Sequence, residues 1–410
     1  MKKFSFLMAI LMLVLTFSGC GGSDTDSGLF SDGLLPVCFN EQWGYIDKEG
    51  KYVINPEFDL AYPFQDGGAW VCVDGKLGRI NKMGEYLIAP QFEYCDATEI
   101  YLFSTFEYGR QLIRNELNVS VTFDTSLVPV RVAKKIGYID LKGNYVINPQ
   151  FDGAIPFDKE NGLAAVWLNG KLGFINKKGE YVINPQFDNE AFGFSNGLVA
   201  VELNGKFGYI DESGKYVINP QFDRAYNFAE NGLARVRVDG KYGYINKNGA
   251  YVINPQFDSA YDFADNGLAR VEVRGKFGYI DKSGAYAINP QFEKAYDFDN
   301  TGLARVRTSN KWGYIDRSGK YTINPQFDDI SSFAPNGLAA VSTNGKIGYV
   351  DKNGNFVIGP QFEDHAIISG YAFFSDGYAI ASLNDQYGII DSNGTYVVSP
   401  QYDYIFPLFD

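Results

Sequence analysis

Three arginines recur at one position of a repeating pattern, and their side chains are the ones in this sequence best suited to bind an anion. Arg235, Arg270 and Arg305 follow one another at intervals of 35 residues, and Arg237 and Arg307 lie two residues beyond the first and the last. Guanidinium groups form paired hydrogen bonds with carboxylate and phosphate oxygens. The five arginines are therefore a candidate site for a carboxylate, a phosphate or an acidic protein loop. The alternative is a solvated strand face on which they pair with Asp and Glu.

A binding site made of these side chains should be exposed. We then expect that changing Arg235, Arg270 and Arg305 to Ala weakens capture of a partner. The same change should shift the free energy of unfolding by about 0.5 kcal/mol or less, as is usual for surface substitutions.

Patterns for catalysis or metal binding are sparse. The single histidine, His365, would have to serve any Ser-His-Asp or Cys-His centre. Turns such as Asp211–Gly214 resemble calcium loops, but their glycine is fourth rather than sixth, which favours a turn-forming role. No pair of acids stands out from the repeating background for glycoside hydrolysis. We therefore predict no catalytic residue, no metal and no cofactor.

The cysteines of the repeat region add little chemistry. Cys38, Cys72 and Cys95 lack the Cys-x-x-Cys spacing of a zinc site. Cys95 stands where other repeats have alanine, so we expect a small core residue. Cys38 and Cys72 occupy the position of Arg237 in neighbouring repeats. A disulfide would need their Cα atoms within about 7 Å, so their pairing stays open.

These residues are carried by a tandem repeat. Ten glycines are each followed, after about eleven residues, by a proline and an aromatic residue. The glycines are Gly44, Gly78, Gly137, Gly173, Gly208, Gly243, Gly278, Gly313, Gly348 and Gly388. Because self-similarity at a fixed period marks a repeat architecture, the array predicts the fold.

The clearest repeat, residues 232–263, predicts strands and no helix. Leu233–Val238 alternates in polarity and is followed by Asp-Gly, a hairpin signal that leads into a second strand. Tyr251–Asn254 is a third strand that Pro255 should end, and residues 260–263 could form a fourth. Strands two and three are apolar on both faces, which predicts sheets covered on both sides.

Antiparallel units of this kind predict an all-β fold of β-propeller-like blades. Gly243 and its counterparts would then lie where neighbouring sheets approach closely. The array begins with a strand at 34–39 and ends with one at 404–409, and neither resembles the polar cap that an open solenoid needs. We therefore expect a ring in which these two strands share a blade. An open β superhelix or two smaller rings are the alternatives, because ten blades exceed the usual number.

The core of the repeat, G-K-x-G-Y-I-D-x-x-G-x-Y-V-I-N-P-Q-F, resembles the WG (KWG) repeat of bacterial cell-envelope proteins. The resemblance covers all ten units, essentially residues 33–410. The Trp-Gly pair itself occurs at Trp43-Gly44 and Trp312-Gly313, and other apolar residues replace the tryptophan elsewhere. The resemblance implies a β-repeat scaffold, commonly at the cell envelope, and it carries no catalytic residues to transfer.

The N-terminal segment resembles the signal peptide of a bacterial lipoprotein. Lys2 and Lys3 precede an apolar stretch, and Ser18-Gly19-Cys20 resembles a lipobox whose cysteine is acylated. Phe17 departs from the aliphatic residue usual at its position, and the alternative is an ordinary secreted protein. We expect removal of residues 1–19, lipidation of Cys20, a flexible tether at 20–32, and localisation at the outer membrane or cell surface.

One irregularity interrupts the repeat domain at 33–410. Phe92 and Leu127 are 35 residues apart where the equivalent Phe222 and Leu233 are 11 apart. We infer an insertion at about 99–124. Loops on rigid scaffolds often carry function, and the alternative is an insertion that is merely tolerated.

Charge and organisation together predict a class of function. Without Lys2 and Lys3 the net charge of −13 becomes −15, which disfavours nucleic acid as a partner. We expect a monomeric, non-catalytic scaffold that is attached to the membrane only by its N-terminal lipid and binds a protein or glycan. The alternatives are an envelope glycan hydrolase or other carboxylate-based enzyme, and a structural spacer.

Overall fold

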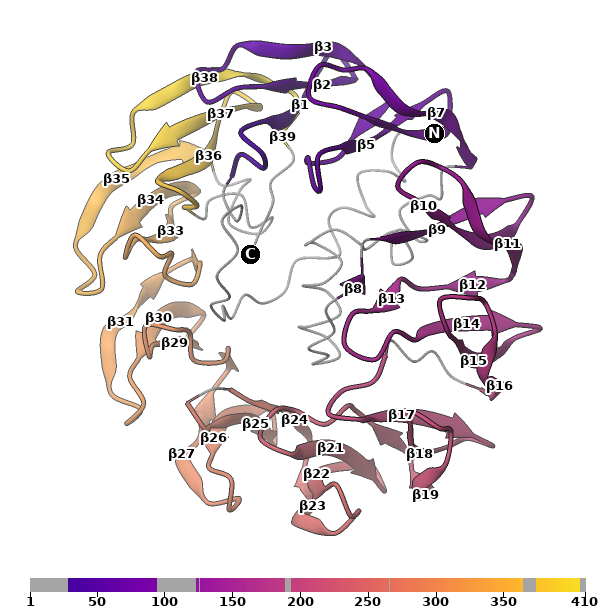
Figure 1. Cartoon of the computed structure of the whole chain (residues 1–410). Helices are drawn as coiled ribbons and strands as arrows, with labels where there is room; N and C mark the ends of the chain where they lie inside the picture. The colour runs from indigo at the N-terminus through magenta and orange to yellow at the C-terminus, as the bar shows by residue number, and fades with distance from the viewer. Residues whose placement is uncertain are drawn as a thin grey trace, which may run out of the picture. The chain divides into compact units, whose positions relative to one another are not determined.

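The fold is all-β. The computed structural model describes residues 29–93, 123–124, 126–188, 193–264, 266–363 and 374–405. Within these ranges the strands form ten antiparallel sheets of three or four strands, and each sheet is a β-propeller blade (Figure 1). The predicted fold class is confirmed. The same ranges contain no helix long and apolar enough to cross a membrane.

Each blade is built on three strands that follow one another along the chain. The first strands are β1 (Leu35–Phe39), β5 (Ala69–Val73), β9 (Leu127–Val132), β14 (Ala164–Leu168), β17 (Leu198–Leu203), β21 (Leu233–Val238), β25 (Ala269–Val273), β29 (Ala304–Thr308), β33 (Ala339–Thr343) and β36 (Tyr378–Leu383). The second strands are β2 (Gln42–Ile46), β6 (Lys76–Ile80), β10 (Lys135–Asp140), β15 (Lys171–Ile175), β18 (Lys206–Asp211), β22 (Lys241–Asn246), β26 (Lys276–Ile280), β30 (Lys311–Ile315), β34 (Lys346–Val350) and β37 (Gln386–Asp391). The third strands are β3 (Tyr52–Phe58), β7 (Tyr86–Glu93), β11 (Tyr145–Phe151), β16 (Tyr181–Phe187), β19 (Tyr216–Phe222), β23 (Tyr251–Phe257), β27 (Tyr286–Phe292), β31 (Tyr321–Phe327), β35 (Phe356–Glu363) and β38 (Tyr396–Tyr402).

Several blades have a short additional strand that pairs with the first. These strands are β4 (Leu60–Ala61), β12 (Gly153–Ala154), β20 (Arg224–Ala225), β24 (Ser259–Phe263), β28 (Lys294–Ala295), β32 (Asp329–Ile330) and β39 (Tyr404–Ile405). The segment at 260–263, expected as a fourth strand, belongs to β24 and pairs with β25 of the following repeat. Each blade therefore combines the end of one repeat with the start of the next.

This offset leaves the first blade to be completed from the far end of the chain. β39 pairs with β1, with Val37 opposite Ile405, and Asp403 donates its backbone N–H to the Cys38 carbonyl at 2.9 Å. Figure 1 shows β39 beside β1. The expectation that the first and last strands share a blade is confirmed, and an open superhelix would not have this pairing.

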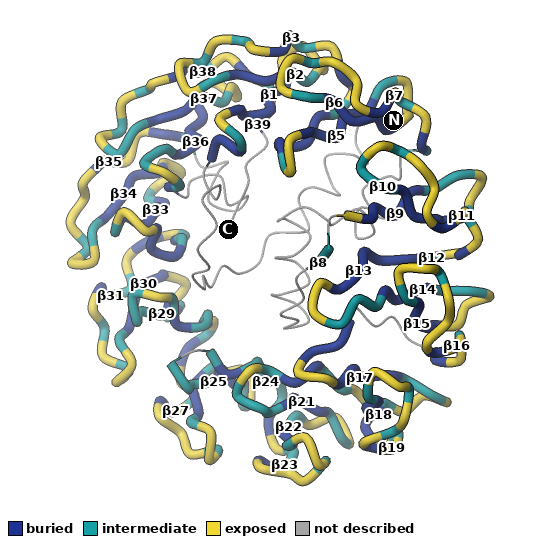
Figure 2. Tube along the Cα trace, viewed as in Figure 1, coloured by how far each residue is buried: buried dark blue, intermediate teal, exposed yellow. Residues whose placement is uncertain are grey.

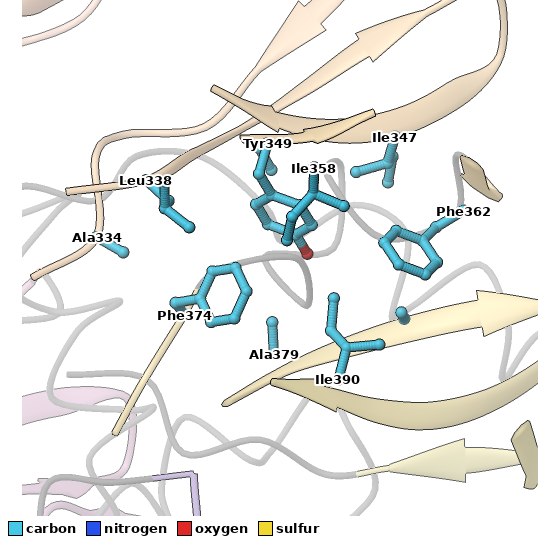
Figure 3. Packing of buried hydrophobic residues seen from close by; sticks show 11 residues of the cluster. Ala334, Leu338, Ile347, Tyr349, Ile358, Phe362, Phe374, Ala379 and Ile390 are labelled. Atoms are coloured by element: carbon cyan, nitrogen blue, oxygen red, sulfur yellow. The ribbon is translucent and has the colours of Figure 1, made fainter. Parts of the chain in front are cut away.

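The chain divides into two compact units of five blades each, residues 95–292 and the remainder. Within each unit, apolar side chains of neighbouring blades form shared cores. In the core between the blades of β32–β35 and β36–β38, Tyr349 and Ile358 of one blade pack with Ala379 and Ile390 of the other (Figure 3). Stacking of blades within each unit therefore buries apolar side chains that a single sheet would leave exposed.

Buried tyrosines add polar contacts between blades. The Tyr209 and Tyr244 hydroxyls donate to the carbonyls of Tyr226 and Tyr261, at 2.7 and 2.5 Å, and each acceptor lies in the next blade. Burial raises the pKa of Tyr209 well above its ordinary value, so this hydroxyl remains a donor at neutral pH.

The repeated glycine is required by the blade itself. A Cβ at Gly243 would lie 2.5 Å from the Ile253 carbonyl oxygen and 2.6 Å from the Pro255 nitrogen. Both atoms belong to β23, the third strand of the same blade. The expected close approach between neighbouring sheets at this glycine is therefore wrong, because the close contact lies within one sheet.

Two expectations about the third strand are also wrong. Pro255 does not end it, since β23 continues to Phe257. β23 is the edge strand of its sheet, where a residue without an N–H interrupts no ladder on the open side. The third strand is not covered on both faces either, because Tyr251 and Val252 are 44% and 42% exposed. Figure 2 shows such exposed positions along β23 and the other third strands.

Candidate functional site

The arginines spaced by 35 residues occupy equivalent places on three first strands. Arg235, Arg270 and Arg305 each lie opposite the buried tyrosine of the second strand. Arg235 and Arg270 are each 6% exposed, and Arg305 is half-buried. The expectation of exposed side chains is therefore wrong for Arg235 and Arg270.

Arg235 joins two blades. Its Nε donates to Asp262 Oδ1 at 2.9 Å, and its Nη1 donates to the Ala260 carbonyl at 2.6 Å, both in the following blade. The guanidinium lies 3.9 Å from the centre of the Tyr226 ring of its own blade. Burial acts to lower the pKa of Arg235, but Asp262 and nearby tyrosines outweigh it and the pKa is raised. The side chain thus remains charged inside a contact between blades.

Arg270 and Arg305 repeat the aromatic part of this arrangement. The guanidinium of Arg270 lies 3.6 Å from the centre of the Tyr261 ring, and that of Arg305 lies 4.0 Å from the centre of the Tyr296 ring. Arg305 also donates to the Ile330 carbonyl of the next blade at 3.0 Å. Cation–π contacts of all three arginines, together with the interblade hydrogen bonds of Arg235 and Arg305, account for these residue types without a ligand. Ligand binding by the three stays a prediction.

Arg237 and Arg307 lie two residues further along their strands and are half-buried. The Nε of Arg307 is 3.7 Å from Glu293 Oε2. This contact is too long for a hydrogen bond, and the Nε atoms of Arg237 and Arg307 are both buried without a hydrogen-bond partner among the residues that the structure describes. On the neighbouring strand, the residue opposite Arg237 is Arg224.

The sequence analysis missed Arg224. It directly follows the Gln-Phe-Asp that ends a repeat, and the equivalent positions hold Leu60, Gly153, Ser259, Lys294 and Asp329. Variation at a position next to the structural motif was the available signal. It was hidden because only the strand register shows that this position lies beside Arg237.

The position of Arg237 differs strongly between blades. In each blade it lies on the first strand, opposite the residue that precedes the repeated glycine. Its occupants are Cys38, Cys72, Arg131, Trp167, Glu202, Arg237, Glu272, Arg307, Ser342 and Ser382. One place in a regular framework therefore carries basic, acidic, aromatic and small side chains.

Two of these occupants are buried free thiols. Cys38 and Cys72 are each 3% exposed and are not joined by a disulfide. Burial is the main reason why the pKa of each rises to about 11. Both thiols are therefore protonated at neutral pH and react slowly with electrophiles.

The Asp-x-x-Gly segments form turns. Asp211 Oδ1 accepts the backbone N–H groups of Ser213 and Lys215, both at 3.0 Å. Hydrogen bonds, first from the Ser213 hydroxyl, lower the pKa of Asp211. The turn-forming interpretation accounts for these contacts. Within the described ranges, no group of three or more His, Cys, Asp or Glu side chains could hold a metal ion.

Several predicted residues lie outside the described ranges, namely Cys20, Cys95, His365 and most of the insertion at 99–124. The end of the insertion is described. There, β8 (Phe123–Asp124) pairs with β13 (Phe157–Asp158), and Lys177 forms an ion pair with Asp124. This end is therefore attached to the blade that contains β14–β16.

Comparison with protein families gives one clear match. A model described as the WG containing repeat matches residues 43–76, 136–171, 173–207, 207–242, 242–277, 277–312, 312–346, 347–387 and 387–410. A search of curated proteins gave no match.

The solved structures that match are only distantly similar to this chain. A eukaryotic initiation factor has a TM-score of 0.47 at 11% identity, covering 79% of this chain and 94% of that chain. The extracellular domain of a hybrid two-component system from B. thetaiotaomicron has a TM-score of 0.25 at 11% identity, covering 92% of this chain and 66% of that chain. PorZ, a surface component of the type-IX secretion system of Porphyromonas gingivalis, has a TM-score of 0.27 at 8% identity, covering 93% and 59%.

Proposed function

Because the chain belongs to the family of proteins built from the WG containing repeat, we propose that it is a non-catalytic scaffold of the bacterial cell envelope. In this proposal the protein is a monomer that binds a protein or glycan partner through the surface of its blades, and it does not bind nucleic acid. One observation carries the proposal. The repeated residues, such as Gly243 and Tyr244, form contacts that hold the blades together, whereas the side chain at the position of Arg237 differs in chemical type from blade to blade.

A surface of this kind suits recognition. Rigid β-sheets fix each variable side chain in a known register, so recognition requires little ordering of the protein on binding. Function on such a framework is expected where the pattern breaks. The position equivalent to Arg237 supplies positive charge or aromatic area in three blades, through the half-buried side chains of Arg131, Trp167 and Arg237.

Anchoring at the membrane forms the second part of the proposal. Ser18-Gly19-Cys20 after an apolar stretch supports export and lipidation at Cys20. Changing Cys20 to Ala should release the protein from membranes or leave its first residues uncleaved, as measured by fractionation and mass spectrometry. A variant that is still cleaved and equally membrane-bound would contradict the anchor.

Partner binding can be tested with the full chain, immobilised and exposed to envelope glycans and envelope proteins. We expect saturable binding of one class, weakened when Trp167 and Arg237 are both changed to Ala. A matched control changes Met83, which is 75% exposed in a turn, to Ala. Cleavage of a glycan would instead support the hydrolase alternative, and no binding of either class would support the spacer.

A further inference from the structure

We propose that Arg224 and Arg237 bind the carboxylate or phosphate group of an acidic glycan. This deepens the proposed function and rests on it, because it assigns one blade, β20–β23, as a place of binding and names the chemistry of the partner. The inference depends on the pairing of the two arginines, on the absence of an ion pair to either of them within the described ranges, and on the aromatic rings beside them.

The two arginines lie directly opposite each other on β20 and β21. Residues paired in this way extend their side chains on the same face of the sheet, and like charges there repel each other. An oxyanion between the two guanidinium groups would remove this repulsion and accept charge-assisted hydrogen bonds from both.

Neither arginine forms an ion pair or a side-chain hydrogen bond with the residues that the structure describes, and the charge of Arg237 is only the smallest of the causes that lower the pKa of Asp223. Arg224 is exposed, and Arg237 has a buried Nε without a hydrogen-bond partner. The acid next to Arg224 in the chain, Asp223, is already engaged. Its Oδ1 lies 2.6 Å from Lys206 Nζ, and its Oδ2 accepts the backbone N–H of Asp239 at 2.8 Å. The hydrogen bond from Lys206 is the largest cause of the lowered pKa of Asp223.

Aromatic rings border the arginine pair and favour a sugar over a peptide. Arg237 lies opposite Tyr242, with its guanidinium 5.7 Å from the ring centre. The rings of Tyr226 and Tyr242 have centres 6.4 Å apart, and both side chains are partly exposed. Tyrosines offer flat apolar faces with a polar tip. The Tyr242 ring, and the face of Tyr226 that Arg235 does not cover, therefore suit contact with the C–H face of a sugar ring.

Two other blades show that this combination is specific to its blade. Opposite Arg307 lies Lys294, but the Arg307 Nε is 3.7 Å from a Glu293 oxygen. At the same place in the blade of β24–β27, Ser259 lies opposite Glu272. The repeat therefore does not require two arginines here, and the blade of β24–β27 has no cation at this pair of positions.

The test measures binding to the full chain by calorimetry. The probes are a galacturonate trimer, glucose 6-phosphate, inorganic phosphate, a neutral galactose trimer and a tetraglutamate peptide. We expect an acidic sugar to bind and the neutral trimer not to bind. The galacturonate and sugar phosphate show which oxyanion is preferred, and inorganic phosphate shows whether the sugar contributes.

Arg224→Gln and Arg237→Gln should each weaken binding by about tenfold or more, as loss of a charge-assisted hydrogen bond implies. Lys294→Gln is the matched control and should leave binding unchanged. The two arginine variants should unfold at the same temperature as the parent or higher, because each removes a like-charge contact. A lower unfolding temperature with unchanged binding would assign the pair a structural role.

Unchanged binding in both arginine variants, no binding of any acidic probe, or tighter binding of tetraglutamate than of the sugars would overturn the proposal. These outcomes are separable from failure of the proposed function. If Arg224→Gln and Arg237→Gln still capture the envelope partner of the parent, the scaffold role stands and the anion site is wrong. If the parent captures no envelope component, the scaffold role itself is wrong.

Discussion

Replacing Arg235 by Ala should strongly destabilise the protein, although the residue was expected to be on a solvated face. The change removes an ion pair with Asp262, a hydrogen bond to the Ala260 carbonyl and the contact with the Tyr226 ring. The side chains of Arg235 and Asp262 are only 7% and 13% exposed. Removing one partner of a buried pair leaves the other charge uncompensated, so we expect a loss of about 3–5 kcal/mol.

Urea unfolding of Arg235→Ala measures this loss, and Lys135→Ala is the matched control. Lys135 and Asp152 also pair between neighbouring blades, but each side chain is 42% exposed, so the control should lose about 1 kcal/mol or less. Adding Asp262→Asn to Arg235→Ala should regain part of the stability, because the stranded charge is removed. If Arg235→Ala costs no more than Lys135→Ala, the assignment of Arg235 to a blade-to-blade contact is refuted.

Three further predictions concern other parts of the framework. Gly243→Ala should lower the free energy of unfolding by about 3 kcal/mol or more, because its Cβ would lie 2.5 Å from a backbone atom. Gly232 has a φ of 78° and open space around it, so Gly232→Ala should lower it by about 1–2 kcal/mol. Chemical denaturation measures both values, and equal losses would contradict the close contact at Gly243. The pKa of Asp152 is lowered, first by the hydrogen bond from Lys135. The carboxylate therefore stabilises the folded state above its unfolded pKa, and this stabilisation is lost as pH falls through the lower folded pKa, below about pH 4. In Asp152→Asn the free energy of unfolding should fall less steeply with acid than in the parent, and an unchanged pH dependence would count against the pair. Cys38 and Cys72, with pKa values of about 11, should react with a thiol reagent at pH 8 only as fast as the protein opens; rapid labelling of the folded protein would show that they are accessible.

Local patterns predicted the strands well because each repeat carries its own signals. The alternation in Leu233–Val238 and the Asp-Gly turn are enforced within a few residues, and β21 and β22 follow them. The pairing of chain ends was also predictable, since a repeat array without polar caps leaves a strand at each end unpaired. The partner of each short strand was not, because pairing of β24 with β25 depends on the following repeat.

Side-chain roles were harder to predict than strands. Alternation placed Arg235 on the face opposite Val236, but it could not show that a neighbouring blade brings Asp262 and Ala260 to that face. The same limit applies to Arg224, which becomes a neighbour of Arg237 only through strand register. Burial between blades is a property of the assembled stack, so a polar residue in one repeat can be read as exposed when it is not.

The central claim is that the first and last described strands, β1 and β39, share one blade. Breaking this pairing tests the claim most directly. Deleting Tyr404–Asp410 removes Ile405, which is 2% exposed in a core with Leu35 and Val37. Amide exchange should then become rapid over Leu35–Phe39 and remain slow over Ala69–Val73, a first strand that does not pair with β39. Exchange at Leu35–Phe39 as slow as in the intact protein would contradict the shared blade.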